Sequence, residues 1–254
     1  MSSPATEPPD FGAAALSYDR LRPADDNWRE LLEALVEEGD LRGRRVLDVG
    51  CGTGSVLAAL VERHAARAWG VDPSPEMLEV ARRRLPRGTA VRVGRAEELP
   101  FRDGWFDGAL MRLVLHLVDR PAALAELRRV LRDDGSLVIA TFDSDHFDGH
   151  WLNAFFPAVE EIDRARFPTA AELEAELEAA GFAAPRLRRL VQHASLEREE
   201  ALTRIRGRYI STLRLLDDDE FEQGLSRAEA GLPARIDHEL RWLVVATRAR
   251  TGTA

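Results

Sequence analysis

Residues 46–54 constrain the fold of this chain most strongly, because a short apolar strand pattern there runs into three alternating glycines and then into an alanine-rich helical pattern. Glycine lets a backbone take positive φ and approach a ligand closely, and a turn that enters a helix presents unpaired N–H groups to polar ligand atoms. The spacing is Gly-x-Gly-x-Gly, which differs from the Gly-x-Gly-x-x-Gly of dinucleotide-binding loops. Taken alone, the segment allows either a ligand-binding loop or a glycine-rich turn without a ligand.

An acidic residue, Asp72, ends a second strand pattern about 20 residues after the glycine loop. In a βαβ unit the end of the second strand lies beside the first loop, so a carboxylate there can accept hydrogen bonds from both hydroxyls of a ribose. Ser74 and Pro75 follow as the expected N-cap and first residue of a helix, which aims Met77 at the same pocket. We interpret Met77 as either a core residue or a ligand contact.

Four motifs stand in a defined order along the chain: VLDVGCGTG, GVDPSPEML, GRAEELPFRDGWFDGAL and LRRVLRDDGSLVIATF. Together they resemble the class I S-adenosylmethionine-dependent methyltransferases, particularly the type 11 domain group that includes the quinone-pathway C-methyltransferases and many small-molecule enzymes. The resemblance covers about residues 15–145. It implies S-adenosyl-L-methionine as the cofactor, and an α/β fold with a Rossmann-like, doubly wound, seven-stranded sheet that is mostly parallel with an antiparallel last strand.

The resemblance also implies roles for individual residues. Asp48 and the backbone of Gly50, Gly52 and Gly54 would hold the methionine part of the cofactor, and Asp72 would bind the ribose hydroxyls. The further residues expected to bind the cofactor are Tyr18, Cys51, Thr53, Pro73, Met77, Arg95, Ala96, Glu97 and Arg112.

Adenine recognition departs from the family pattern. Ala96 would offer its backbone N–H to adenine, but Arg95 stands where the family commonly has an aspartate that accepts a hydrogen bond from the adenine amino group. Arginine has only donors. Either Glu97 replaces that acceptor or the contact is lost.

His116 is the candidate catalytic residue, because the resemblance places it beside the sulfonium end of the cofactor, at the carboxyl edge of the fourth strand. A general base is required only if the methyl acceptor must lose a proton. The alternative is a histidine at a helix start or in the core.

Strand and helix patterns alternate through the first half of the chain, which predicts a parallel sheet with helices on both faces. The expected strands are 45–50, 67–72, 89–93, 106–112 and 135–142, with helices at 55–65, 75–84 and 121–132. Later elements are helices at 169–180, 196–215 and 218–230 and strands at 185–194 and 235–247. Ligands of such sheets bind at the carboxyl ends of the strands.

We predict a single methyltransferase domain over residues 1–254. Its expected parts are a disordered lead (1–11), an N-terminal helical segment (12–40), a cofactor-binding core (41–143), cap helices with the sixth strand (144–231), and the last strand and tail (232–254). The cap is expected to cover the substrate end of the sheet.

Six cap residues are candidate substrate contacts: His146, His150, Trp151, Arg204, Arg208 and Tyr209. The first three follow the fifth strand and would supply a base or an aromatic wall, unless they are surface loop residues. The last three share one helical face at i, i+4 and i+5, and would bind an acidic substrate group if that face points inward. The two histidines with nearby aspartates are a weak ligand set, so we predict no metal.

Composition excludes several chemistries. All 35 basic residues are arginine, which removes a lysine Schiff base and the lysine of a Walker-type phosphate loop. A net charge of −9 disfavours nucleic-acid binding. The single cysteine excludes a disulfide and a cysteine-rich zinc site. Neither a long apolar run nor a secretory signal is present, so we expect no membrane partner and a cytoplasmic location.

These observations favour methyl transfer from S-adenosylmethionine to an oxygen, nitrogen or carbon atom of a small molecule. The alternatives are an RNA or protein acceptor, a noncatalytic S-adenosylmethionine-binding protein, and a nicotinamide oxidoreductase, against which the glycine spacing argues.

Overall fold

The computed structural model describes residues 11–12 and 15–251. The predicted disordered lead therefore lies outside the described residues, except for Phe11, whose ring contacts the guanidinium of Arg214 at 5.3 Å.

Seven strands of the described chain form one sheet in the order β3-β2-β1-β4-β5-β7-β6. They are β1 (Arg45–Val49), β2 (Arg67–Asp72), β3 (Ala90–Val93), β4 (Phe106–Arg112), β5 (Leu131–Phe142), β6 (Arg186–Glu197) and β7 (Arg235–Arg248). The first five pair in parallel, whereas β7 runs antiparallel to both β5 and β6. This confirms the predicted doubly wound sheet with an antiparallel last strand.

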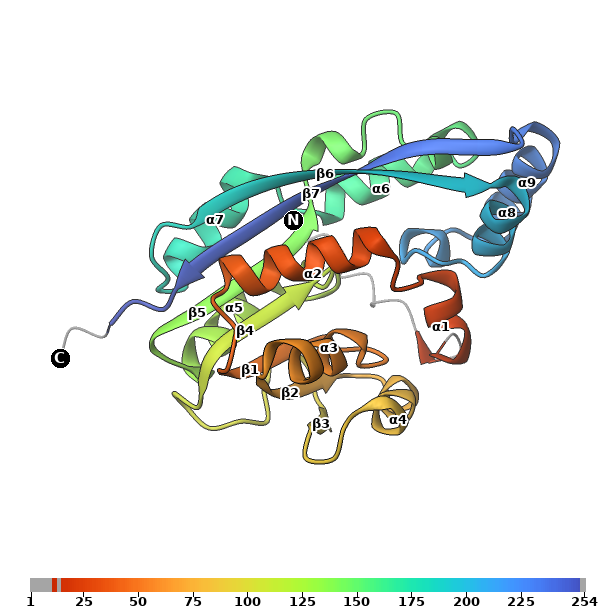
Figure 1. Ribbon diagram of the computed structural model, residues 1–254. Coiled ribbons are helices and arrows are strands. Elements are labelled where there is room, and N and C mark those ends of the chain that lie inside the picture. Colours follow the sequence, from red (N-terminus) through yellow and green to blue (C-terminus); the bar gives the residue numbers. More distant parts are fainter. Residues whose placement is uncertain (1–10, 13–14, 252–254) are drawn as a thin grey trace.

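Helices cover both faces of the sheet (Figure 1). They are α1 (Ala15–Leu21), α2 (Asp26–Glu38), α3 (Ser55–His64), α4 (Pro75–Arg84), α5 (Arg120–Val130), α6 (Ala158–Arg166), α7 (Ala170–Ala179), α8 (Arg198–Arg206) and α9 (Asp218–Gly231). Short 3-10 turns are η2 (Leu115–Leu117), η3 (Ser144–His146), η4 (Trp151–Ala154) and η5 (Thr212–Arg214).

Two apolar clusters hold these layers together. Leu127 of α5 and Leu173 of α7 pack on one face of the sheet, and Leu35 of α2 and Leu57 of α3 pack on the other. The strands between them are apolar on both faces, as in other buried parallel sheets.

Helix starts follow from local sequence. The Ser74 hydroxyl accepts a hydrogen bond from Met77 N at 3.2 Å, with Pro75 as the first helical residue, as predicted. Thr169 and Glu172 form a capping box at the start of α7. These caps fix where each helix leaves its preceding loop.

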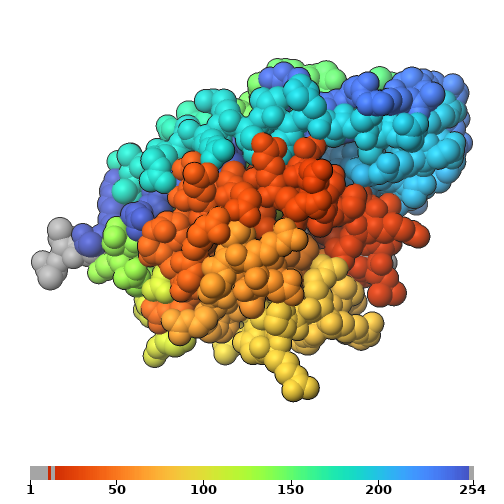
Figure 2. All heavy atoms as spheres, viewed as in Figure 1, coloured from red at the N-terminus to blue at the C-terminus, as the bar shows by residue number. Residues whose placement is uncertain are grey.

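A third apolar cluster lies in the region predicted to form the cap, and we keep that name for it. It joins η4 and α6 to α8 and α9, which lie in the connection between β6 and β7, and the side chain of Phe156 is fully buried at its centre. In Figure 2 the cyan and blue atoms of α8 and α9 are separated by the red N-terminal helices from the orange and yellow atoms of the segment that holds β1, β2 and β3.

Two predicted helices differ from the structure. The helix expected at 121–132 ends at Val130, because β5 begins at Leu131. The helix expected at 196–215 is wrong at both ends: β6 continues to Glu197, paired with Arg235 of β7, and α8 ends at Arg206. At residues 196–197, pairing with β7 outweighs the local helix propensity.

Candidate functional site

A cavity of about 720 Å³ opens at the carboxyl ends of β1, β2, β4 and β5. Gly50, Asp72, Arg112 and Phe142 line it from the ends of these four strands. The strand order reverses between β1 and β4, so the cavity lies at the switch point where doubly wound sheets bind ligands. Its volume is within the range of small-molecule sites.

The glycine loop is shaped for close approach of a ligand. Gly50 has φ +73°, and a Cβ there would lie 2.4 Å from Cγ2 of Val114. Gly52 has φ +51° and open space where a Cβ would be. Packing therefore requires the first glycine, while the second leaves room beside the cavity.

Asp72 is held by the backbone of two loops. Gly52 N and Ser74 N each donate to one carboxylate oxygen at 2.9 Å. Burial raises the pKa of this carboxyl, whereas the two hydrogen bonds lower it. The result is a fixed acceptor at the cavity wall, where the sequence predicts ribose binding.

Asp48 lies deeper in the structure and does not line the cavity. Burial, and then the charge of Asp72, raise the pKa of Asp48 to about 7, against a lowering effect of Arg112. Oδ2 of Asp48 has no hydrogen-bond partner among the described residues. Burial thus favours the protonated form of Asp48, which lies behind the cavity wall.

Most residues predicted to bind the cofactor line the cavity: Tyr18, Gly50, Gly52, Asp72, Pro73, Met77, Arg95, Ala96, Glu97 and Arg112. Besides Asp48, three others do not. Cys51 is buried, Thr53 hydrogen bonds to Asp19, and Gly54 is the N-cap residue of α3.

A clamp that the sequence does not predict joins α1 to the glycine loop. The Thr53 hydroxyl donates to Oδ1 of Asp19 at 2.7 Å, and Arg84 of α4 binds both Asp19 and the carbonyl oxygen of Thr53. These contacts hold α1, and with it Tyr18, at the cavity mouth. No local motif marks them, since the three residues are far apart in the sequence.

At the expected adenine end, Glu97 is oriented by its neighbours. Arg95 Nη2 and Asp119 N donate to Oε1 of Glu97 at 3.2 and 3.1 Å. Glu97 thus presents a carboxylate acceptor beside Arg95, which stands where the family commonly has an aspartate.

His116 lies over the ring of Phe167, with centroids 4.1 Å apart and planes at 14°. Its Nε2 is 3.1 Å from Oγ of Ser211, a cap residue that the sequence analysis missed. Burial, and then the charges of Arg166 and Arg22, hold the pKa of His116 well below its usual value. The imidazole is therefore neutral, and a weak base.

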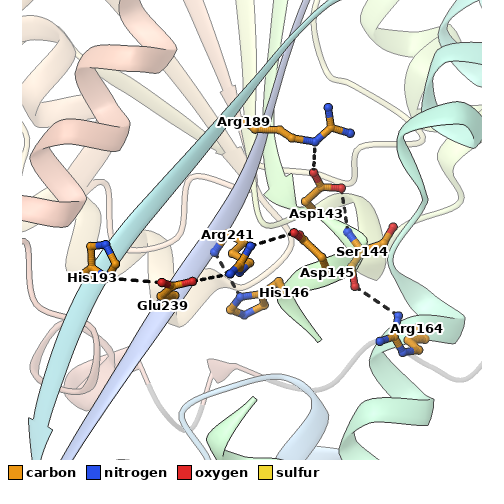
Figure 3. Close-up of polar contacts among 9 residues, drawn as sticks. All are labelled: Asp143, Ser144, Asp145, His146, Arg164, Arg189, His193, Glu239 and Arg241. Atoms are coloured by element: carbon orange, nitrogen blue, oxygen red, sulfur yellow. Dashed lines mark hydrogen bonds and ion pairs between the residues drawn. The ribbon is translucent and has the colours of Figure 1, made fainter. Parts of the chain in front are cut away.

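His146 and His150 reach the same cavity from η3 and the start of η4. Figure 3 shows how the loop of His146 is fixed: Asp143 accepts from Arg189 Nε at 2.6 Å, and Asp145 accepts from Arg241 at 3.0 Å. The position of His146 is thus set by ion pairs to β6 and β7.

Two of the four remaining substrate candidates face the cavity. Arg204 and Tyr209 line it, whereas Trp151 and Arg208 do not. The prediction for Arg208 is wrong because α8 ends before it: Arg208 has φ +44°, donates to Asp218 and lies over the ring of Phe221. Trp151 packs against the apolar cluster of the cap.

Within residues 11–12 and 15–251, no group of three histidine, cysteine or acidic residues is arranged to hold a metal ion. In the same part of the chain, no helix has the length and apolar character needed to cross a membrane.

Comparison with known proteins agrees with this geometry. A family model described as a methyltransferase domain matches residues 47–139. An uncharacterized methyltransferase of Mycobacterium bovis is 42% identical over 127 residues, which cover 50% of this chain and 49% of that protein. An O-methyltransferase of Aspergillus nomiae is 32% identical over 167 residues, covering 61% of this chain and 69% of that one. The chain thus spans about half the length of the mycobacterial relative.

Among solved structures, a putative methyltransferase of an antibiotic biosynthesis pathway from Anabaena variabilis has the same fold, with a TM-score of 0.67 and 24% identity over 85% of this chain and 96% of that one. The chain belongs to the class I S-adenosylmethionine-dependent methyltransferases.

Proposed function

We propose that this protein transfers the methyl group of S-adenosylmethionine to a nucleophilic atom of a small molecule. The observation that carries the proposal is one cavity that joins the glycine loop and Asp72 to a set of cap residues. Such a cavity holds a nucleoside at one end and leaves a second compartment for the acceptor.

The residues present fit the cofactor. Asp72 is a buried, fixed carboxylate beside a loop that leaves room for a ligand at Gly52. Glu97 offers an acceptor for an adenine amino group, and the backbone N–H of Ala96 is next to it in the chain. When bound, S-adenosylmethionine supplies an activated methyl on sulfur, and in-line attack forms the bond to the acceptor as the sulfur–methyl bond breaks.

The chain's own contribution is positioning. Holding two reactants in attack geometry lowers the activation barrier by on the order of 7–11 kcal/mol, whereas a general base accelerates a reaction by roughly 10²- to 10⁴-fold. Since a tenfold change in rate corresponds to about 1.4 kcal/mol, positioning contributes more. His116 lines the cavity and is neutral, so we assign it to positioning the acceptor. An acceptor that loses a proton would release it to solvent.

The test is incubation of the purified protein with methyl-labelled S-adenosylmethionine and extract of the source cells, followed by separation of small molecules, nucleic acids and proteins. We expect label in the small-molecule fraction. Label that follows RNA or protein would reject the small-molecule acceptor. Cofactor binding by calorimetry without transfer to any fraction, in an extract where a control methyltransferase works, would indicate a noncatalytic binder.

A further inference from the structure

Four of the six histidines line the cavity: His116, His146, His150 and His238. A neutral imidazole has one donor nitrogen and one acceptor nitrogen. In each of these rings one nitrogen already has a partner in the protein. The chemistry that the other nitrogen offers to a ligand follows from that partner.

His146 and His150 use the same arrangement. Nδ1 of His146 accepts from the backbone N–H of Arg241 at 3.3 Å, and Nδ1 of His150 accepts from that of Leu152 at 3.4 Å. A nitrogen that accepts carries no proton, so in both neutral rings the proton is on Nε2.

Both rings are neutral at physiological pH. Burial is the main cause, and it lowers the pKa of His146 to about 3 and that of His150 to about 4. The neighbouring His238 lowers both values further. Each ring therefore offers a neutral Nε2–H donor.

His116 is held against the cap. Its Nε2 lies 3.1 Å from Oγ of Ser211, which accepts from Arg166 at 3.3 Å. Nδ1 of His116 is buried and has no partner among the described residues. This ring therefore bounds the cavity with its stacked neighbour Phe167 and offers no accessible donor to a ligand.

His238 has the opposite role. Its Nδ1 lies 3.5 Å from the carbonyl oxygen of Ile236, which can only accept, so Nε2 is left as an acceptor. The same cavity is also lined by the carboxylates of Asp163 and Glu200, the latter paired with Arg204 at 2.7 Å. His146 and His150 are therefore the histidines that offer a donor to a ligand.

The cavity also has flat aromatic walls. The ring of His146 is stacked on Phe142 at 3.8 Å, and Trp242 lies 4.5 Å from Phe142. The stacked pair of His116 and Phe167 adds a further wall. Aromatic walls of this kind favour a planar ligand.

We propose that the methyl acceptor is a planar aromatic compound with hydrogen-bond-accepting oxygens, such as a hydroxylated aromatic ketone, and that His146 and His150 donate to those oxygens. This inference rests on the proposed function. An ammonium group in place of the ketone is disfavoured at these two rings, because it has donors only and would meet two Nε2–H donors.

Three compounds of similar shape test the proposal: ortho-hydroxyacetophenone, ortho-ethylphenol, which lacks the carbonyl, and ortho-(aminoethyl)phenol, which replaces it with a cation. Their affinities are measured by calorimetry on the full chain with S-adenosylhomocysteine present. We expect the ketone to bind at least about tenfold more tightly than the ethyl compound, since buried donors left unpaired cost about 1–3 kcal/mol. The amine should bind most weakly.

Variants assign the effect to the histidines. His146→Phe keeps a flat ring against Phe142 but removes the N–H, and should reduce the preference for the ketone severalfold. His193→Phe is the matched control, because His193 is exposed, pairs with Glu239 and does not line the cavity (Figure 3). It should leave the preference unchanged.

Equal affinities for the three compounds, a preference for the amine, or no ketone binding in the millimolar range would overturn the inference. Nitrogen NMR of the unmodified protein gives a second test that needs no variant. We expect neutral rings with Nε2–H at His146 and His150, and a charged ring or the other tautomer at either position refutes the proposal. Binding of S-adenosylhomocysteine without ketone preference rejects this inference alone, whereas failure to bind S-adenosylhomocysteine rejects the proposed function.

Discussion

Replacing Asp72 tests the cofactor site most directly, because its carboxylate is the fixed acceptor at the ribose position. In the folded chain it accepts one hydrogen bond from Gly52 N and one from Ser74 N, both at 2.9 Å. Each oxygen still has a lone pair for a ribose hydroxyl. Asp72→Ala removes those acceptors and leaves two backbone donors unpaired.

The expected loss follows from the strength of such bonds. A hydrogen bond to a charged group contributes about 1.5–3 kcal/mol, and each 1.4 kcal/mol changes affinity about tenfold. Loss of one ribose contact therefore weakens S-adenosylmethionine binding at least about tenfold. Asp72→Asn keeps one acceptor oxygen and should lose less.

The assay is calorimetric titration of S-adenosylmethionine into each variant, with unfolding measured in parallel. Burial raises the pKa of Asp72, so its ionised form is disfavoured in the folded chain, and removing the charge offsets part of the lost hydrogen bonding. The variants should therefore remain folded. Glu79→Gln is the matched control, since Glu79 is exposed on the neighbouring helix α4 and pairs with Arg83. Unchanged affinity in Asp72→Ala would refute the assignment of Asp72 to the ribose.

Three further predictions concern the loop, the buried acid and the cap. Gly50→Ala places a Cβ 2.4 Å from Val114 at φ +73° and should lower the free energy of unfolding in urea by about 1–3 kcal/mol. The same change should also weaken cofactor binding. The pKa of Asp48 rises from 3.8 to about 7 on folding, so its contribution to stability is present at low pH and is lost as the pH rises between these values. This loss amounts to up to about 4 kcal/mol of unfolding free energy, and Asp48→Asn should remove it. Phe156→Ala empties a fully buried site against Gly224 and should cost about 3–5 kcal/mol in urea unfolding, yet leave calorimetric cofactor affinity within about twofold of wild type under folding conditions, because the glycine loop packs in other clusters.

Each of these has an outcome that contradicts it. The double change Gly50→Ala with Val114→Ala removes the steric contact, so it should recover part of the lost stability, and no recovery would place the cost elsewhere. A pH dependence that persists unchanged in Asp48→Asn would assign it to another group. A tenfold loss of cofactor affinity in Phe156→Ala would mean that the cap supports the cofactor end directly.

The cofactor half of the chain is predictable from sequence because its signals are local. Glycines at fixed spacing, an acid at a strand end and a capped helix are each set by neighbouring residues, and Gly52, Asp72 and Ser74 meet as the βαβ pattern predicts. Asp48 is the exception: it lies in the same motif but deeper than the cavity wall.

The acceptor half is less predictable because its contacts join distant residues. His116 meets Ser211, which is 95 positions away, and no pattern around either residue indicates the pair. Arg208 was expected to share a helical face with Arg204, but the chain leaves the helix between them. Helical spacing indicates a shared face only where the helix continues.

The place of β7 between β5 and β6 sets the order in which the protein can be completed. β6 pairs with β7 alone among the described strands, and α8 and α9 come before β7 in the chain. During synthesis the five parallel strands can therefore assemble first. β6 and the cap helices can join the sheet only after β7 has been synthesised, because β7 follows them in the chain. Contacts that span so much of the chain form slowly. Until β7 is made, the apolar side of the cap has no sheet to join, and this is the stage at which the nascent chain is most exposed to aggregation.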